Sequence, residues 1–349
     1  MPTYKDEKRG TWYCSFYYTD WTGAKKRKKK EGFKKESEAK AFERKFLEKQ
    51  QNNCDMSFET LADLYLEDVT TRVRPTTMKT KKFIIDTIIS PYFNKIKVNE
   101  VTPNSVRKWQ NEMIKKGYSQ TYLKTINNQI RAIFNFAIKY YNLDSSPALK
   151  AGPMGKKDAE SMKFWTVEEF KKFIQFDDKS ASELAFKILF WTGMRSGELM
   201  ALTFKDVDLN NKTININKTC TRLNRKDIIS EPKTPRSKRK ISISESLCKD
   251  IKEYKDNIYG IKEEDRIFNF TKSFLTYEMR RISKKSEVKR IRLHDLRHSH
   301  ASLLIELGFT PLLIAERLGH EKVETTLNTY SHLYPNKGKD IANKLDDLY

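Results

Sequence analysis

All five histidines of this 349-residue chain lie beyond residue 293, beside other residue types that suit phosphate chemistry. In the segment HDLRHSHASLLIELG, three leucines predict the buried face of a helix: Leu296, Leu303 and Leu307. His294 and Arg297 stand three residues apart, so both side chains project from one face of that helix. An imidazole and a guanidinium on one face can converge on one ligand, and an oxyanion would suit them.

A second pair of residues follows on two shorter helices. The segment TPLLIAERLGH predicts a second helix, because it begins with residues typical of a helix start and its Gly319 is typical of a helix end. His320 therefore comes directly after a helix. The next short helix presents Tyr330 in ETTLNTYSHLY. We expect these helices to place His320 and Tyr330 near the first pair.

Further cations lie upstream. Arg195, in TGMRSGELMALTF, follows an apolar helix that anchors its backbone near a core. Its planar guanidinium can grip two phosphate oxygens at once, which a lysine cannot do, although Arg195 would also suit a structural ion pair with Glu198. Lys233, in the turn SEPKTPRSKRK, is a flexible cation that can give a proton to a leaving oxygen. Which basic residue of this turn gives the proton stays open, because three others lie close to Lys233: Lys238, Arg239 and Lys240.

A tyrosine needs help to act as a nucleophile, because the pKa of its hydroxyl is about 10. Neighbouring cations favour the phenolate and also stabilise the negative charge that builds up on a phosphorus under attack. His294 and His298 are four residues apart and could hold zinc, but no H-E-x-x-H and no suitably spaced acid or cysteine is present. We therefore expect neither a metal nor another cofactor, and the roles of His300 and His332 stay open.

Five segments, taken in order, resemble the motif set of the tyrosine recombinase family. They are the segments around Arg195, Lys233, His294 to Arg297, Leu318-Gly319-His320, and Tyr330. The resemblance covers about residues 160–335, and the two modules before it look like the arm-binding and core-binding domains of phage and conjugative-transposon integrases. It therefore extends over nearly the whole chain.

The resemblance implies a role for each of these side chains. Tyr330 would become joined to a 3′ phosphate and free a 5′ hydroxyl, and the hydroxyl of a second strand would then reverse the step. Arg195 and Arg297 would hold the non-bridging oxygens of the phosphate, and Lys233 would protonate the leaving 5′ oxygen. Three further residues would act in proton transfer, in phosphate contact or in support of the site: His294, His320 and Glu198.

The resemblance also implies partners. They are duplex DNA at core and arm attachment sites, further copies of the chain in a tetramer on DNA, and an excisionase and a DNA-bending protein as accessory factors. Two rival functions stay open: a type IB topoisomerase, and a DNA-binding regulator that has kept the fold but lost catalysis. The arm-like module favours integration and excision over topoisomerase activity, and the presence of all the expected side chains counts against a regulator. Whether the element is a prophage or a conjugative transposon stays open.

The net charge of +22 fits a nucleic acid partner, because it creates an attractive field for a polyanion. An anionic membrane is the competing polyanion, but the chain has no run of about 18 apolar residues to span one. The N-terminus also lacks the apolar stretch of a signal peptide, so we expect a cytoplasmic protein. The four cysteines form no C-x-x-C pair, which argues against a zinc site and a redox dithiol.

The sequence patterns predict a multidomain α+β protein that begins with a small β-sheet-plus-helix domain, residues 1–54. There TWYCSFYY suits a strand, AKKRKKKEGF suits an exposed edge strand, and KESEAKAFERKFLEKQ suits a helix. Because aromatic and basic residues coincide, we expect this domain to bind DNA, although a solvated face would carry the same charges. The candidate contacts are Trp12, Tyr17, Lys25, Lys26, Arg27 and Lys28.

The remaining chain divides at a polar stretch. Residues 55–148 contain four stretches of helical periodicity and predict a helical, SAM-like core-binding domain. Residues 149–163, rich in Pro, Gly, Ser and Lys, predict a linker. Residues 164–349 predict a mainly helical catalytic domain, in which TININ and KISIS alternate as in a small antiparallel sheet and are joined by a long polar connection.

Overall fold

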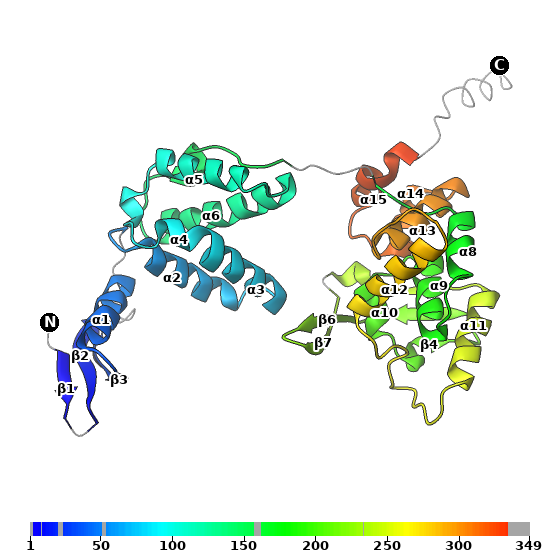
Figure 1. Ribbon diagram of the computed structural model, residues 1–349, viewed down its shortest axis with the longest axis horizontal. Coiled ribbons are helices and arrows are strands. Elements are labelled where there is room, and N and C mark those ends of the chain that lie inside the picture. Colours follow the sequence, from blue (N-terminus) through cyan, green and yellow to red (C-terminus); the bar gives the residue numbers. More distant parts are fainter. Residues whose placement is uncertain are drawn as a thin grey trace, which may run out of the picture. The chain divides into compact units, whose positions relative to one another are not determined.

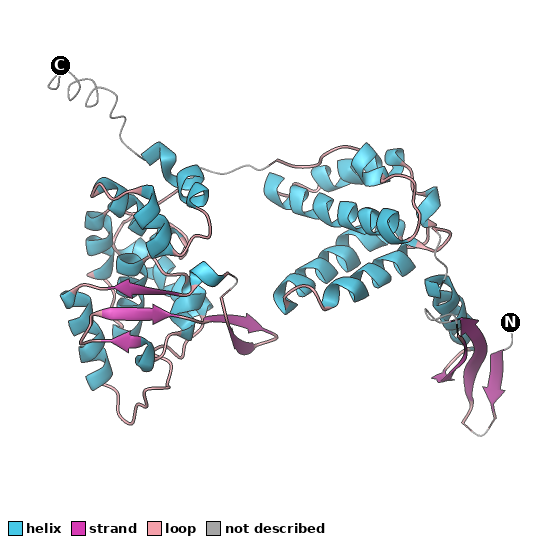
Figure 2. Cartoon of the chain, turned by 180° about the vertical axis from the view of Figure 1, so that it is seen from behind, coloured by secondary structure: helices cyan, strands magenta, loops and turns pink. Residues whose placement is uncertain are grey.

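The chain forms two compact units, Met1–Ala159 and Glu160–Tyr349, each with hydrophobic cores of its own. The computed structural model describes residues 3–7, 9–19, 24–50, 54–156, 162–232 and 234–333. Most elements are helices and the strands form small antiparallel sheets, which confirms the predicted fold class (Figures 1 and 2). Among the described residues, no helix is long and apolar enough to cross a membrane.

The first unit begins with an antiparallel sheet in the order β1-β2-β3, packed against helix α1. Its elements are β1 (Thr3–Asp6), β2 (Thr11–Thr19), β3 (Lys25–Phe33) and α1 (Glu36–Gln50). The predicted strand at TWYCSFYY, the lysine-rich edge strand and the helix are confirmed, whereas β1 was not predicted. Buried Cys14, Phe16 and Ala39 form the small core between sheet and helix.

A helical bundle follows in the same unit. Its helices are α2 (Phe58–Thr70), α3 (Pro75–Ile84), α4 (Ser90–Phe93), α5 (Pro103–Lys115), α6 (Gln120–Tyr140) and α7 (Pro147–Lys150). A π-helical turn, Ile85–Ile89, joins α3 to α4, and Val98–Glu100 form a short 3-10 turn. The four predicted helical stretches are confirmed. Met154 is buried in the bundle core, so packing continues past residue 149, where the linker was predicted to begin.

The second unit is built from eight α-helices within the part of the chain that the structure describes. They are α8 (Val167–Ile174), α9 (Ser180–Thr192), α10 (Ser196–Ala201), α11 (Glu245–Asp256), α12 (Lys272–Lys285), α13 (Asp295–Glu306), α14 (Pro311–Leu318) and α15 (Val323–Tyr330). Three 3-10 turns are Phe204–Asp206, Pro235–Ser237 and Ser331–Leu333. Their buried faces form one large core and one small cluster around Tyr330.

Two small sheets complete the second unit. The strands β4 (Val207–Asp208), β5 (Thr213–Ile216) and β8 (Arg239–Ser242) form an antiparallel sheet, which confirms the two predicted strands. The connection between β5 and β8 holds a hairpin that was not predicted, β6 (Thr219–Leu223) with β7 (Lys226–Ser230). Its two-residue turn, Asn224-Arg225, has φ angles of 49° and 64°. Such turns usually contain glycine, so the sequence signal was weak.

Helix ends in the second unit place the predicted site residues. The buried helix α9 ends at Gly193, which has a left-handed conformation, and Arg195 then caps α10. α13 begins after His294, and its buried face includes Leu296. The prediction that Leu307 is buried was wrong: its side chain is 62% exposed, because α13 ends at Glu306 and Leu307 lies beyond the packed turns.

Candidate active site

Arg297 is a buried arginine fixed by backbone carbonyls at two helix ends. Only 3% of the residue is exposed, and Nη1 donates to the carbonyl of Gly193 at 2.8 Å while Nη2 donates to that of Leu318 at 2.7 Å. Burial, followed by the charges of Arg195 and Arg239, lowers the pKa of Arg297 to about 9, so the guanidinium stays charged at neutral pH. A guanidinium has five N–H donors, so these two contacts leave others without a carbonyl partner in this pair of hydrogen bonds.

Glu198 is the carboxylate that joins two other arginines. Its Oε1 accepts from Nη1 of Arg195 at 2.8 Å, and its Oε2 accepts from Nη2 of Arg239 at 3.0 Å. Burial alone would raise the pKa of Glu198, but Arg239 and then Arg195 outweigh that effect and hold the pKa below its usual value. The side chain of Arg195 is 37% exposed, so this guanidinium is fixed at one edge and accessible at the other.

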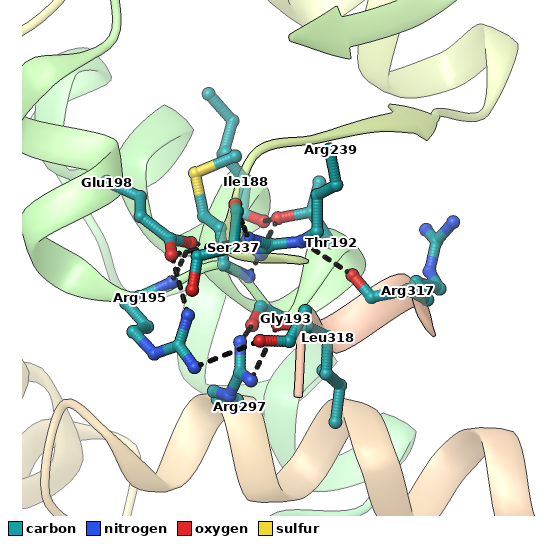
Figure 3. Close-up of polar contacts among 12 residues, drawn as sticks. Ile188, Thr192, Gly193, Arg195, Glu198, Ser237, Arg239, Arg297, Arg317 and Leu318 are labelled. Carbon is teal, nitrogen blue, oxygen red and sulfur yellow. Dashed lines mark hydrogen bonds and ion pairs between the residues drawn. The ribbon is translucent and has the colours of Figure 1, made fainter. Parts of the chain in front are cut away.

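The end of α14 gathers all three arginines (Figure 3). The last C=O groups of a helix have no partner within it. Here the carbonyls of residues 317–319 accept, in turn, from Arg239, Arg297 and Arg195, at 2.8, 2.7 and 3.4 Å. Because the helix dipole favours positive charge at this end, three like charges can stand together beside a single carboxylate.

Two of the predicted histidines face this cluster as neutral imidazoles. Burial, then the charges of Arg297 and Arg195, lowers the pKa of His320 to about 3, and its Nδ1 lies 2.7 Å from Oγ1 of buried Thr326. Burial, then His298 and Arg297, lowers the pKa of His294 to about 4. A neutral imidazole has one donor and one acceptor nitrogen, so both side chains can accept a proton.

Tyr330 is buried rather than presented to solvent. The residue is 1% exposed and belongs to the small cluster formed by α13, α14 and α15. Burial raises the pKa of Tyr330 to about 12, although the charge of Arg297 acts in the opposite direction. Its hydroxyl lies 2.8 Å from Nδ1 of His298, a hydrogen bond whose donor depends on the tautomer of the imidazole.

Sequence reasoning missed two residues of this site. His298 was weighed only as a zinc ligand, although its spacing of four from His294 already indicated one helix face; the two rings have centroids 5.2 Å apart. Arg239 was one of several cations near Lys233. The alternation along β8 could have singled it out, because Arg239 shares a face with buried Ile241 while Lys240 is exposed.

The remaining candidates lie elsewhere or cannot be placed. Lys233 and the side chain of His332 lie outside the described residues. His300 is buried, and its Nε2 accepts from Nε of Arg317 at 2.9 Å. Arg317 in turn donates to the carbonyls of Trp191 and Ser242, so His300 helps to hold α14 in place.

Among the described residues, one group has the spacing of metal ligands, and it is not part of this site. Asp177, Asp178 and Glu278 offer oxygens within 4.8 Å of one another. Lys179 pairs with Glu278 at 2.5 Å, and Arg281 pairs with both Glu278 and Asp178. These cations account for the acidic cluster as an ion-pair network.

The candidate DNA contacts of the N-terminal sheet lie mostly on its exposed surface. Lys25, Lys26, Arg27 and Lys28 are all exposed along the edge strand β3, and Tyr17 is 66% exposed. Trp12 differs, because it is half-buried and packs against the core beneath the sheet.

Comparisons with known proteins agree with this architecture. Residues 163–337 match the profile of the Phage integrase family. Residues 57–114 match that of the N-terminal SAM-like domain of phage integrases, and residues 2–50 match that of an arm DNA-binding domain. The ICEBs1 integrase of Bacillus subtilis (strain 168) is 34% identical over 318 residues, which cover 86% of each chain.

Solved structures show the same fold. The Tn1549 transposon integrase in complex with a circular intermediate DNA has a TM-score of 0.70 at 22% identity, over 83% of this chain and 99% of that one. A lambda integrase tetramer bound to a Holliday junction has a TM-score of 0.58 at 17% identity, over 92% of this chain and 96% of that one.

Proposed function

Because the chain belongs to the phage integrase family and is therefore a site-specific tyrosine recombinase, we propose that it integrates and excises a mobile DNA element through a covalent bond between Tyr330 and a 3′ phosphate. The observation that carries this proposal is the arrangement at the end of α14. Three fixed guanidiniums gather there, and the charge of Arg297 acts on the hydroxyl of Tyr330.

In this proposal, Tyr330 attacks a phosphate of one DNA strand, becomes joined to its 3′ side and releases a 5′ hydroxyl. Arg195 and Arg297 hold the non-bridging oxygens and stabilise the charge that grows on them in the transition state. Their fixed positions support this role, since donors that are already in place need no reorganisation when the charge develops. Attack by the hydroxyl of a second strand then reverses the step and conserves the bond energy.

Four other residues complete the reaction. Lys233 protonates the leaving 5′ oxygen, and His294 and His320 contact the phosphate or transfer protons. Both imidazoles are neutral at pH 7, which leaves each of them a nitrogen that can accept a proton. Glu198 supports the site by its ion pairs with Arg195 and Arg239, and it has no direct role in the chemistry. The chemistry proposed for these residues needs neither metal nor ATP.

The same proposal assigns DNA partners to the parts of the chain. Residues 1–54 bind arm-type sites, residues 55–148 and 164–349 bind the core site, and the polar stretch after Met154 links the two core-binding parts. Four copies assemble on DNA, as the lambda integrase does on a Holliday junction. An excisionase and a DNA-bending protein set the direction of the reaction.

A suicide substrate tests the proposed nucleophile. It is a core-site duplex, taken from the repeats that flank the element, with a nick just 3′ of the scissile phosphate, so that the released fragment diffuses away. The intact protein should become covalently attached to the strand through its 3′ phosphate, and Tyr330→Phe should abolish attachment while DNA binding persists. Failure of the intact protein to attach to any of these duplexes would contradict the proposal.

The rival topoisomerase activity uses the same covalent step but has a different product. A recombinase should join strands from two separate duplexes that carry matched core sites. A type IB topoisomerase should instead relax a single supercoiled circle that carries no such site. Relaxation without strand joining would favour the topoisomerase.

A further inference from the structure

The hydroxyl of Tyr330 has one hydrogen-bond partner among the described residues, the imidazole of His298. The Nδ1 and hydroxyl oxygen atoms are 2.8 Å apart, and the ring centroids are 5.6 Å apart. His298 projects from α13 and Tyr330 ends α15, so the contact joins two helices of the small cluster. When Nδ1 carries no proton, the hydroxyl donates to it, which is the geometry required for transfer of that proton.

We propose that His298 is a further catalytic residue, whose Nδ1 accepts the phenolic proton of Tyr330 during cleavage and returns it during resealing. This inference rests on the proposed function. As the bond forms between the tyrosine oxygen and phosphorus, the O–H bond of Tyr330 breaks and its proton moves to Nδ1. The bond between phosphorus and the 5′ oxygen breaks at the same time, and that oxygen takes its proton from Lys233.

The surroundings of Tyr330 explain why a base is needed. Burial raises the pKa of its hydroxyl to about 12 and outweighs the opposing charge of Arg297, so that charge alone does not produce a phenolate at neutral pH. Once the oxygen begins to bond to phosphorus, its proton becomes far more acidic, and transfer to a nearby imidazole becomes favourable. The base must therefore already be in contact.

His298 suits this task better than the other neutral imidazoles. Burial lowers the pKa of His298, so it is neutral and able to accept a proton at pH 7. The Nδ1 of His320 contacts Thr326, and His300 accepts from Arg317. Among the described histidines, His298 alone touches the reacting atom.

A substitution that keeps the hydrogen bond but removes the base tests the proposal. His298→Asn places an amide close to the position of Nδ1, where it can contact the hydroxyl but cannot take its proton at neutral pH. We expect single-turnover cleavage of the nicked core-site duplex to slow by about 10²-fold or more, the usual contribution of a general base. The thermal unfolding midpoint and DNA binding should stay unchanged.

A more acidic tyrosine distinguishes two roles for His298, that of a base and that of a residue that only positions Tyr330. Replacing Tyr330 by 3-fluorotyrosine lowers the pKa of the phenol and should restore much of the rate lost in His298→Asn. His294→Asn, four residues earlier and directly before α13, is the matched control, and its defect should not be restored.

Two results would overturn the proposal. Cleavage by His298→Asn at or above the rate of the unchanged protein would mean that the contact only holds Tyr330 in the absence of DNA. Slow cleavage that 3-fluorotyrosine does not restore would assign His298 a positioning role. In either case, attachment by the unchanged protein and its loss in Tyr330→Phe would show that the proposed function itself stands.

Discussion

Two strands of this chain carry runs of basic residues, and the structure uses those residues in opposite ways. On β3, the run from Lys25 to Lys30 is exposed along its whole length. On β8, the side chain of Arg239 is only 7% exposed and is held by Glu198 and the end of α14, while its neighbour Lys240 is exposed. Burial, rather than charge, thus separates a cation with a fixed position from an exposed one.

The difference follows from the cost of removing a charge from water. An exposed ion pair contributes about 0–1 kcal/mol and is screened by salt, so the cations of β3 are suited to long-range attraction. A buried charge costs several kcal/mol unless partners compensate for it. Arg239 has such partners in Glu198 and in the carbonyls of Ser237 and Arg317. Its removal should therefore disturb the whole site.

The largest effect is expected for Arg239→Ala. This change leaves Glu198 buried with Arg195 as its remaining guanidinium partner and removes a donor from the end of α14. Breaking a buried pair costs about 3–5 kcal/mol, which corresponds to a fall of roughly 10 °C in the thermal unfolding midpoint for a unit of this size. Covalent attachment to the nicked duplex should fall as well.

Lys240→Ala is the matched control for that prediction, because Lys240 is the next residue on the same strand but is exposed. Its thermal unfolding midpoint should stay within about 2 °C of the unchanged protein, as expected for a surface substitution. An equal fall in the thermal unfolding midpoint of Arg239→Ala and Lys240→Ala would mean that burial does not distinguish the two cations.

Much of the local structure could be predicted, because it depends on residues close in sequence. The start and end of α14 followed from TPLLIAERLG, and Arg195 was expected directly after an apolar helix, which is α9. The contacts of Arg239 with α14, and of His298 with Tyr330, join residues far apart in the sequence. Periodicity assigns a side chain to a face, but it does not say what lies against that face.

The burial of Tyr330 shows the same limit. Its helix was predicted to present the side chain, and α15 does end there. That α13 and α14 cover the ring depends on how three helices pack, which no local pattern encodes. The prediction that Leu307 is buried was wrong for a related reason. The periodic pattern of apolar residues continues in the sequence after the packed part of the helix has ended.

Glu198→Gln should have the second largest effect, and it should depend on pH. At neutral pH, the loss of charge-assisted hydrogen bonds costs about 2 kcal/mol. Because the pKa of Glu198 is lowered in the folded protein, its stabilising effect is present above the unfolded-state pKa and is lost as the pH falls through the folded-state value. The unfolding free energies of Glu198→Gln and of the unchanged protein should therefore converge as the pH is lowered from 7 to 3. A constant difference between them would contradict the negative charge assigned to Glu198.

Gly319→Ala should have a smaller effect on stability but a clear one on the site. Gly319 has a φ of 68°, where alanine costs about 1–2 kcal/mol. A Cβ atom there would lie 3.0 Å from the Cδ and Nη1 atoms of Arg239 and would press on that guanidinium. Gly308→Ala is the control, since Gly308 has a φ of 82° but open space around it. Both variants should lose similar stability, and only Gly319→Ala should slow covalent attachment.

The smallest effect on stability is expected on β3, where Lys28→Gln should change the unfolding free energy by less than about 0.5 kcal/mol. Its effect should appear in DNA binding instead. If Lys28 contacts a phosphate of arm-site DNA, the slope of log affinity against log salt concentration should fall by about 1. Cleavage of a nicked duplex that carries only the core site should not change. A loss of stability as large as that of Arg239→Ala, with no change in salt dependence, would remove the distinction between fixed and solvated cations.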